Sequence, residues 1–202
     1  KAPAAAVAQD QSQYVGQETC LTCHEQQSYK GTLHGITTNP RTPAATHGCE
    51  SCHGPGKAHV DGGGDKSKIL QIKQMKPQAA SELCTTCHNR GTHALWSGSQ
   101  HDSRNVGCIS CHSVHKPAGP KQLKAKSEIE LCSTCHRNVT NKQYRFNHMP
   151  VREGKLSCTS CHNVHGSTNQ KLLKAGTTVD ESCTSCHAEK RGPYLWEHAP
   201  VA

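Results

Sequence analysis

A five-residue pattern, Cys-x-x-Cys-His, recurs seven times along the 202-residue chain and takes up all 14 cysteines. This spacing is the attachment signature of c-type haem. Both thiols add to vinyl groups of the porphyrin, and the histidine that follows at once binds the iron. We therefore predict seven covalently bound haem c groups, held by the cysteine pairs Cys20 and Cys23, Cys49 and Cys52, Cys84 and Cys87, Cys108 and Cys111, Cys132 and Cys135, Cys158 and Cys161, and Cys183 and Cys186.

The histidine of each motif is the predicted proximal iron ligand. Two other uses of cysteine explain the pattern less well. A zinc site takes its cysteines as two pairs, and a histidine directly after each second cysteine has no role there. A disulfide framework would not confine every cysteine to one spacing. The proximal ligands are His24, His53, His88, His112, His136, His162 and His187.

Apolar side chains are too few for an ordinary hydrophobic core. The chain has one Phe, two Trp and four Tyr, and hydrophobic residues make up only 33% even with cysteine included. Such a composition approaches that of disordered chains, unless the porphyrins supply the missing apolar surface. We expect a mainly α and irregular fold, in which short helices and loops wrap a chain of haems with little or no β-sheet.

The formal net charge of +8 would by itself suggest a nucleic acid or an anionic membrane as partner. The propionates of seven haems outnumber this excess, so we predict no nucleic-acid partner. No apolar run approaches the ~20 residues that span a bilayer, so a membrane-spanning chain is not expected. Haem is attached in this way after export, which predicts a periplasmic or extracellular protein. Ala6-Val7-Ala8 resembles the end of a removed signal peptide.

An internal repeat organises the second half of the chain. Each copy has an upstream histidine, a haem motif with another histidine three residues after it, a Leu-Lys-Ala sequence and a second haem motif. We expect an N-terminal arm with haem 1 at 1–44, then three di-haem modules. The modules are 45–97 (haems 2 and 3), 98–141 (haems 4 and 5), and 142–202 (haems 6 and 7 with a C-terminal histidine segment).

Short helices are predicted to lead into the second motif of each module. Ser81, Ser127 and Asp180 are their candidate N-caps, and Ser127 with Glu130 matches a capping box. A further short helix is expected over 25–34.

Nine histidines lie outside the motifs, and seven irons each need a second axial ligand. Several of these histidines recur at equivalent positions of the repeat, which favours bis-histidine haems of low potential. Met75 and Met149 are too few for a general His/Met scheme, and ordinary packing accounts for them. The nine are His34, His47, His59, His93, His101, His115, His148, His165 and His198.

The pairing of these histidines with irons is predicted from chain distance. His115 lies three residues after proximal His112 and cannot reach the opposite face of the same haem. We therefore expect it to bind the next iron, at His136. The same logic pairs His165 with His187 and His59 with His88, and it pairs the upstream histidines His101 with His112, His148 with His162, and His34 with His53.

This scheme leaves haem 1, at His24, without a distal ligand and leaves His198 without a haem. Three hypotheses address the mismatch. The chain is a fragment of a longer cytochrome, or His47 or His93 caps haem 1, or His198 caps a haem in another chain. The last hypothesis would link subunits end to end.

Longer segments around the motifs add a resemblance that covers nearly the whole chain. They are Lys30–Gly35, Cys49–Pro55 with His59, Trp96 with His101 and Asp102, Cys158–Ser167, and Cys183–Val201. These segments resemble the MtrA/DmsE-type periplasmic decahaem cytochromes, which are outer-membrane electron conduits, and more distantly the pentahaem NrfB proteins. The resemblance departs in haem number, ten against seven. It implies distal ligands at His34, His59, His101, His115, His148, His165 and His198, and none at His47 or His93.

Electron transfer along closely spaced haems is the expected function, and no enzyme activity is expected. An iron that keeps both ligands exchanges an electron with little reorganisation. The expected partners are a quinol-linked cytochrome on one side and an outer-membrane or extracellular cytochrome on the other. One alternative is a multihaem reductase, which requires an open iron, with haem 1 the place to look. Another is the protomer of a cytochrome filament, suggested by the unmatched His198.

Overall fold

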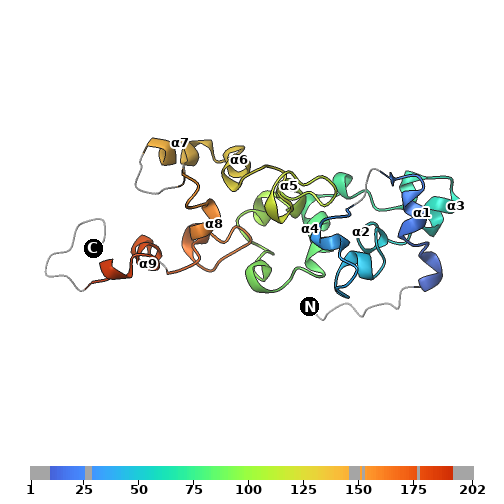
Figure 1. Ribbon diagram of the computed structural model, residues 1–202, viewed down its shortest axis with the longest axis horizontal. Coiled ribbons are helices and arrows are strands. Elements are labelled where there is room, and N and C mark those ends of the chain that lie inside the picture. The colour runs from blue at the N-terminus through green and yellow to red at the C-terminus, as the bar shows by residue number, and fades with distance from the viewer. Residues whose placement is uncertain (1–9, 26–28, 146–150, 152, 177, 193–202) are drawn as a thin grey trace.

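The computed structural model describes residues 10–25, 29–145, 151, 153–176 and 178–192, with the backbone alone at 143–145 and 179. The described chain forms an elongated body in which successive haem motifs follow one another along the long axis (Figure 1). Helices α1 (Gln17–Leu21) and α3 (Lys57–Asp61) lie at one end and α9 (Val179–Thr184) at the other. This arrangement agrees with a row of cofactors.

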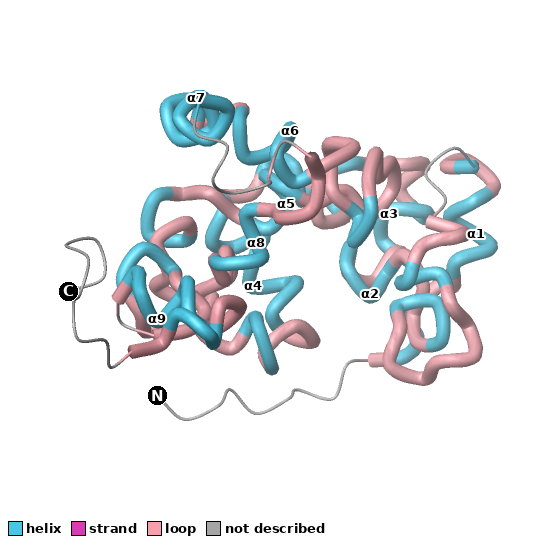
Figure 2. Tube along the Cα trace, turned by 60° about the vertical axis from the view of Figure 1, so that its left-hand side comes forward, coloured by secondary structure: helices cyan, strands magenta, loops and turns pink. Residues whose placement is uncertain are grey.

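Short helices and connecting loops make up almost all of the described chain (Figure 2). Its β structure is confined to two isolated bridges, His112–Leu123 and His162–Leu173. The predicted mainly α and irregular fold is therefore confirmed. The other α-helices are α2 (Glu50–His53), α4 (Pro77–Thr85), α5 (Cys108–Cys111), α6 (Glu128–Ser133), α7 (Arg137–Arg145) and α8 (Cys158–Cys161). The 3-10 turns are η1 (Gln11–Gln13), η3 (Leu33–Gly35), η4 (Pro43–Ala45), η5 (Lys66–Lys68), η6 (Ile72–Gln74), η7 (Gly91–His93), η8 (Asp102–Arg104), η9 (Pro120–Gln122), η10 (Gln170–Leu172) and η11 (Ala188–Lys190).

The polypeptide alone has almost no hydrophobic core. Among the described residues, the buried apolar side chains are Tyr29, Ala80, Trp96 and Leu123. The accessible surface is 15025 Å² for a 21.8 kDa chain, whereas a compact protein of that mass exposes roughly 9,300 Å². The chain is therefore arranged around a volume that its own side chains do not fill.

The second-half repeat has the same backbone in both copies. In the first copy, Ser113 N–H donates to the Gln122 carbonyl (2.8 Å) and Lys124 N–H to the Cys111 carbonyl (2.9 Å). In the second copy, Asn163 N–H donates to the Leu172 carbonyl (2.8 Å) and Lys174 N–H to the Cys161 carbonyl (2.8 Å). Both copies use a left-handed lysine at the turn, with φ of 54° at Lys121 and 53° at Lys171. The local sequence thus builds one repeated cradle.

One of the three predicted helix caps is confirmed. Ser127 Oγ accepts from the Glu130 amide (3.2 Å) at the start of α6. Ser81 is wrong as a cap, because it lies inside α4 with its hydroxyl bonded to the Pro77 carbonyl. Asp180 is also wrong, because Thr178 caps α9 and Asp180 lies in its first turn.

The helix expected over 25–34 is wrong for the part of it that the structure describes. Residues 29–32 form turns and bends, and only the 3-10 turn η3 follows them. Gly35 packs tightly against this turn, since a Cβ there would lie 2.6 Å from the Tyr29 carbonyl oxygen. None of the helices in the described ranges has the length and hydropathy of a membrane span.

Candidate haem-binding sites

All seven Cys-x-x-Cys-His motifs adopt the same turn. In each, the amide of the histidine donates to the carbonyl of the first cysteine at 2.8–3.1 Å, an i to i+4 bond. One helical turn therefore presents both sulfurs and the imidazole together. All 14 cysteines are free thiols, and each is partly or fully exposed. No group of three or more His, Cys, Asp or Glu in the described part is arranged to hold a bare metal ion, so the zinc alternative has no geometric support.

Thiols of consecutive motifs meet in pairs. Cys20 is hydrogen-bonded to Cys49, and Cys84 to Cys108. Cys132 is bonded to Cys158 in the same way. Sequence reasoning missed these contacts, which join haem sites 1 and 2, 3 and 4, and 5 and 6. Each contact crosses a boundary of the predicted modules instead of lying within one.

The paired thiols differ in acidity. The Cys84 thiol donates a hydrogen bond to the Cys108 sulfur. This bond raises the pKa of Cys84 and lowers the pKa of Cys108 to about 6. The bond from Cys132 likewise lowers the pKa of Cys158 to about 7. Burial raises the pKa of Cys20 to about 11. Since thiolate is the reactive form, the later cysteine of these two hydrogen-bonded pairs is the more nucleophilic before haem is attached.

Backbone carbonyls fix the rings of three proximal histidines. His53 Nδ1 bonds to the Leu70 carbonyl (3.0 Å), His112 Nδ1 to Lys121 (2.9 Å) and His162 Nδ1 to Lys171 (2.7 Å). Metal-bound histidines almost always donate their second ring nitrogen in this way, which leaves Nε2 for the metal.

Two histidines outside the motifs share this arrangement. His59 Nδ1 bonds to the Asp65 carbonyl (2.9 Å), and His101 Nδ1 bonds to the Val164 carbonyl (3.0 Å). In both rings the lone pair of Nε2 is therefore available to bind iron, as it is in the three proximal rings.

Five proximal rings face a histidine from another part of the chain. Two imidazoles on one iron, with Fe–N bonds of roughly 2.0 Å, place their ring centroids about 6.3 Å apart. The observed centroid separations are 6.2 Å in four pairs and 5.8 Å in the fifth. The pairs are His24–His59, His53–His115, His112–His165, His101–His136 and, at 5.8 Å, His34–His88.

The predicted pairing was wrong for all five of these distal histidines. His59, His115 and His165 face the iron sites at His24, His53 and His112. Each therefore reaches back to an earlier haem, instead of the next one. The upstream histidines show the opposite error. His34 and His101 were predicted to bind the first iron that follows them, but they face the second, at His88 and His136. His148 and His198 lie outside the described residues.

The two histidines without a family counterpart occupy different positions. His47 stacks on Tyr14 with a centroid distance of 4.1 Å. His93 lies 5.5 Å from His88 and 4.2 Å from His165, and the second separation is too short for an iron between the rings. Neither faces His24, so the hypothesis that one of them caps haem 1 is wrong, because His59 occupies that place.

Burial keeps several of these imidazoles neutral, which is the form that binds iron. Burial, helped by neighbouring histidines, lowers the pKa of His165 to about 4. Burial also lowers the pKa of His34 and of His93. The His34 Nδ1 is buried and has no hydrogen-bond partner.

The donor set and the apolar surroundings fit haem c. Large apolar side chains that stay exposed lie beside the histidines, as Leu33 beside His34 and Val60 beside His59 show. Leu33 is 68% exposed although it lies in an ordered turn, a position that a porphyrin face would cover. The remaining exposed examples are Ile36, Leu70, Leu95 and Val139.

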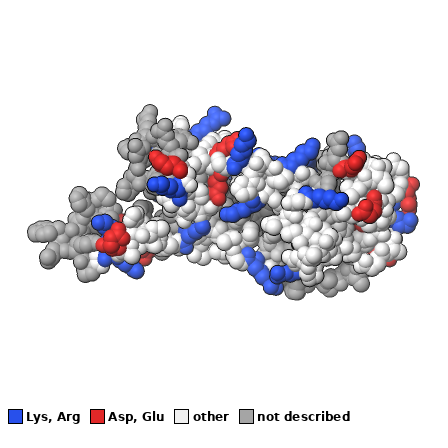
Figure 3. All heavy atoms as spheres, in the orientation of Figure 1, with Lys and Arg blue, Asp and Glu red and all other residues white. Residues whose placement is uncertain are grey.

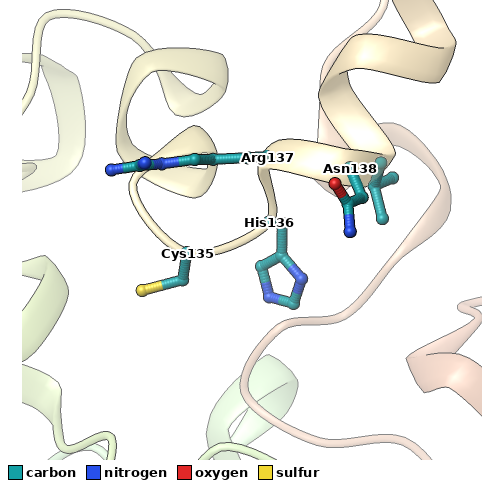
Figure 4. Close-up of a pocket in the computed structure, with 5 residues that line it drawn as sticks. Cys135, His136, Arg137 and Asn138 are labelled. Carbon is teal, nitrogen blue, oxygen red and sulfur yellow. The ribbon is translucent and has the colours of Figure 1, made fainter.

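A cavity of about 410 Å³ opens at the fifth motif, lined by Cys135, His136, Arg137, Asn138 and Val139. The Cys135 sulfur and the His136 ring project to the same side of the turn, into the open space, while Arg137 points away (Figure 4). This is the arrangement expected of a thioether donor and a proximal ligand on one porphyrin.

Basic side chains are distributed along the whole visible face of the molecule, without one dominant patch (Figure 3). Within the described part, Lys–Asp ion pairs form at Lys57–Asp61 (2.8 Å) and Lys68–Asp65 (3.8 Å). This distribution suits scattered anionic groups such as propionates better than one extended polyanion.

Comparisons with known proteins agree with this geometry. A family model described as a doubled CXXCH motif matches residues 148–192, and one for a cytochrome c-type protein NrfB-like matches 49–135. A third, for cytochrome c554 and c-prime, matches 2–54. The chain is 38% identical over 193 residues to the multiheme cytochrome MtrA of Shewanella baltica (strain OS185), covering 92% of this chain and 57% of that protein.

The chain thus spans little more than half the length of that relative. The family models nonetheless cover six of the seven motif turns in full and the turn at Cys132 up to Cys135. The geometry of the motif turns and the sequence similarity therefore agree over most of the chain. The chain therefore belongs to the multihaem c-type cytochromes.

Proposed function

We propose that this protein is a heptahaem cytochrome that carries electrons along a row of bis-histidine haems. The observation that carries the proposal is the set of five facing imidazole pairs, whose centroids lie 5.8–6.2 Å apart. Haem supplies the one-electron chemistry when bound. The chain fixes both axial ligands, so that the iron changes oxidation state without changing its coordination.

The proposed axial ligation follows a simple rule in the repeat. An upstream histidine binds the iron of the second haem motif that follows it, as His34 faces His88 and His101 faces His136. The histidine three residues after a motif binds an iron of the preceding module, as His165 faces His112. By the first part of this rule we assign His148 to the iron at His187.

The irons at His162 and His187 have no facing histidine among the described residues. With His148 assigned to the iron at His187, the iron at His162 remains without a distal ligand. Its ring is nevertheless held for ligation by the bond from Nδ1 to the Lys171 carbonyl. His198 is the remaining histidine of the predicted distal set. We keep it as a ligand for an iron in this chain or in another, and the second case is the proposed route to end-to-end self-association.

The path of the electron is proposed to follow the cysteine pairs. A thioether sulfur is part of the haem edge, so the contacts of Cys20 with Cys49 and of Cys84 with Cys108 bring consecutive haem edges together. Cys132 and Cys158 do the same for haems 5 and 6. Electrons would enter and leave at the two ends of the elongated body.

The cellular setting is proposed from the chemistry of haem attachment, which takes place after export. We place the protein in the periplasm or outside the cell, with low-potential haems typical of bis-histidine ligation. The proposed partners are a quinol-linked cytochrome and an outer-membrane or extracellular cytochrome. The 38% identity to an MtrA protein supports this assignment.

A haem count and a spin-state measurement test the proposal. Pyridine-haemochrome titration and intact mass should give seven haems per chain, and electron paramagnetic resonance should show low-spin iron. His165→Ala should create one high-spin haem, whereas His47→Ala should create none because His47 stacks on Tyr14. A count far below seven, or a fully low-spin His165→Ala protein, would refute the corresponding part of the proposal.

The candidate site for the reductase alternative is different from the one predicted. Haem 1 is no longer the best candidate for an open iron, because His59 faces His24 at 6.2 Å. The site at His162 takes its place. Binding of cyanide or nitrite to the purified wild-type protein, seen as a difference spectrum, would favour this second function.

A further inference from the structure

The distal ring at haem 4 is held differently from those at haems 1 and 5. His59 and His101 each bond to a backbone carbonyl through Nδ1, at 2.9 and 3.0 Å. The His165 ring makes no hydrogen bond to any described residue, although its own backbone amide donates to Asn163 Oδ1 (3.3 Å). Something other than a hydrogen bond must therefore fix the rotation of this ring.

Two aromatic rings surround His165 instead. His93 lies against it with a centroid distance of 4.2 Å and an interplanar angle of 35°. The buried Trp96 meets it edge-on at 6.3 Å and 60°. With these neighbours, the plane of His165 lies 21° from the plane of proximal His112. The planes are also near parallel at His24–His59 (21°) and His53–His115 (29°), and nearly perpendicular, at 80°, at His34–His88 and His101–His136. Haem 1 thus reaches the same angle with a hydrogen-bonded distal ring that haem 4 reaches with a packed one.

The segment that carries His93 and Trp96 is docked on the loop that carries His165. Asn163 Nδ2 donates to the Thr92 carbonyl (3.0 Å), across 71 positions of sequence. A Cβ on Gly166 would collide with the Leu95 carbonyl, and its φ of 134° also requires glycine. The contact is thus specific to this loop, because the preceding repeat has Ser113 and Lys116 at the equivalent positions.

The missing hydrogen bond leaves the electronic support of haem 4 on its proximal side. Donation of the second ring N–H makes a histidine ligand more basic. At haems 1 and 5 the distal rings His59 and His101 have this support, whereas at haem 4 the proximal ring His112 has it, from the Lys121 carbonyl (2.9 Å). The orientation of the distal ring at haem 4 therefore depends on packing.

We propose that His93 is a positioning residue for haem 4, which holds distal His165 nearly parallel to His112 by ring stacking and so sets the magnetic anisotropy of this haem. This inference rests on the proposed bis-histidine ligation.

The test compares His93→Ala and His93→Phe, purified with all haems attached, with His47→Ala as the matched control. His47 is also a stacked histidine without a family counterpart, but its neighbour is Tyr14. Low-temperature electron paramagnetic resonance reports the angle between the axial ligand planes and the spin state of each iron.

The expected result is specific to ring removal. His93→Ala keeps all irons low-spin but shifts the resonance of one haem equivalent. His93→Phe and His47→Ala stay close to the wild type. If His93→Ala fails to assemble, His93→Leu replaces it, since leucine fills the space without a stacking ring.

Two outcomes would overturn the inference. One is a His93→Ala or His93→Leu protein with an unchanged resonance. The other is high-spin iron in His93→Phe, which would make His93 itself an axial ligand. A low-spin haem 4 in His165→Ala would instead refute the ligand assignment on which the inference rests, so the two failures are distinguishable.

Discussion

Two junctions between haem motifs have the same design and different chemistry. At one, α4 packs on α5 and Cys84 meets Cys108, which joins haem sites 3 and 4. At the other, α6 packs on α8 and Cys132 meets Cys158, which joins sites 5 and 6. In each case a side chain of the earlier helix accepts a hydrogen bond from an amide at the start of the later helix.

The accepting group is neutral at the first junction and charged at the second. Ser81 Oγ accepts from the Cys108 amide (3.1 Å) and is almost fully buried. The Glu128 carboxylate accepts from the Thr159 amide (3.1 Å) and hydroxyl (2.8 Å). A carboxylate at a helix N-terminus is also favoured by the unsatisfied amides there. The contact between haem sites 3 and 4 therefore does not depend on a titrating acceptor. The contact between sites 5 and 6 does, and its stability should vary with pH.

The largest expected effect comes from exchanging one residue between the junctions. Gly107 directly precedes the haem motif at Cys108, in the first junction. Ser157 directly precedes the haem motif at Cys158, in the second junction. A Cβ on Gly107 would lie 2.8 Å from the Pro77 carbonyl oxygen and 2.9 Å from Ser81 Oγ. Gly107→Ser should therefore destabilise the holoprotein by about 3 kcal/mol through overpacking, measured as a lower urea midpoint. The reciprocal Ser157→Gly removes a capping box and the hydrogen bond from Ser157 to the Glu128 carboxylate, and should cost about 1 kcal/mol.

Removal of the charged acceptor should have the next largest effect. Glu128→Ala leaves the Thr159 amide and hydroxyl without their partner and should destabilise the protein by about 2 kcal/mol, since hydrogen bonds to charged groups are the stronger ones. Urea unfolding followed by haem absorbance measures it. Glu130→Ala on the same helix removes a bond to the Lys126 amide outside the junction and serves as the control.

Removal of the neutral acceptor should be milder. Ser81→Ala loses the bond from the Cys108 amide and the one to the Pro77 carbonyl, with an expected cost of about 1 kcal/mol for neutral hydrogen bonds. If Ser81→Ala proved more destabilising than Glu128→Ala in the same urea experiment, the ranking of the two junctions would be reversed.

The smallest expected effect is a difference in pH dependence. Burial raises the pKa of Glu128, but hydrogen bonds from Ser157 and Thr159 outweigh it, so the pKa lies below its ordinary value of 4.5. A carboxyl whose pKa is lower in the folded state stabilises the protein above its unfolded pKa. This stabilisation is lost as the pH falls through the folded pKa. Glu128→Gln should therefore flatten the acid limb of the urea midpoint against pH, and Ser81→Ala should leave its slope unchanged.

Local features of this chain were predictable from sequence, because a few neighbouring residues determine them. The motif turn at Cys108–His112, the capping by Ser127 and the repeated cradle all depend on contacts within about ten positions. The mainly α and irregular fold followed from the scarcity of apolar side chains. Leu33 stays exposed because the polypeptide has too few apolar side chains to cover it. The division into di-haem modules stays a prediction.

Axial pairing was not predictable in this way, because it depends on long-range docking. Distance along the chain favoured His115 for the iron at His136, whereas the structure turns it toward His53. The contacts that bring His165 to His112 include Asn163 with Thr92 and Gly166 with Leu95. Nothing in the spacing of the motifs encodes these contacts, although the glycine directly after His165 was a visible difference between the repeats.

The backward reach of His59, His115 and His165 has a consequence for maturation. Each completes an iron site that began to form earlier along the chain. During export the corresponding haems would pass through a five-coordinate stage, and each would close only when the following stretch had emerged and folded. Assembly thereby becomes directional, and a polypeptide cut before His165 would carry a reactive, ligand-accepting iron at His112.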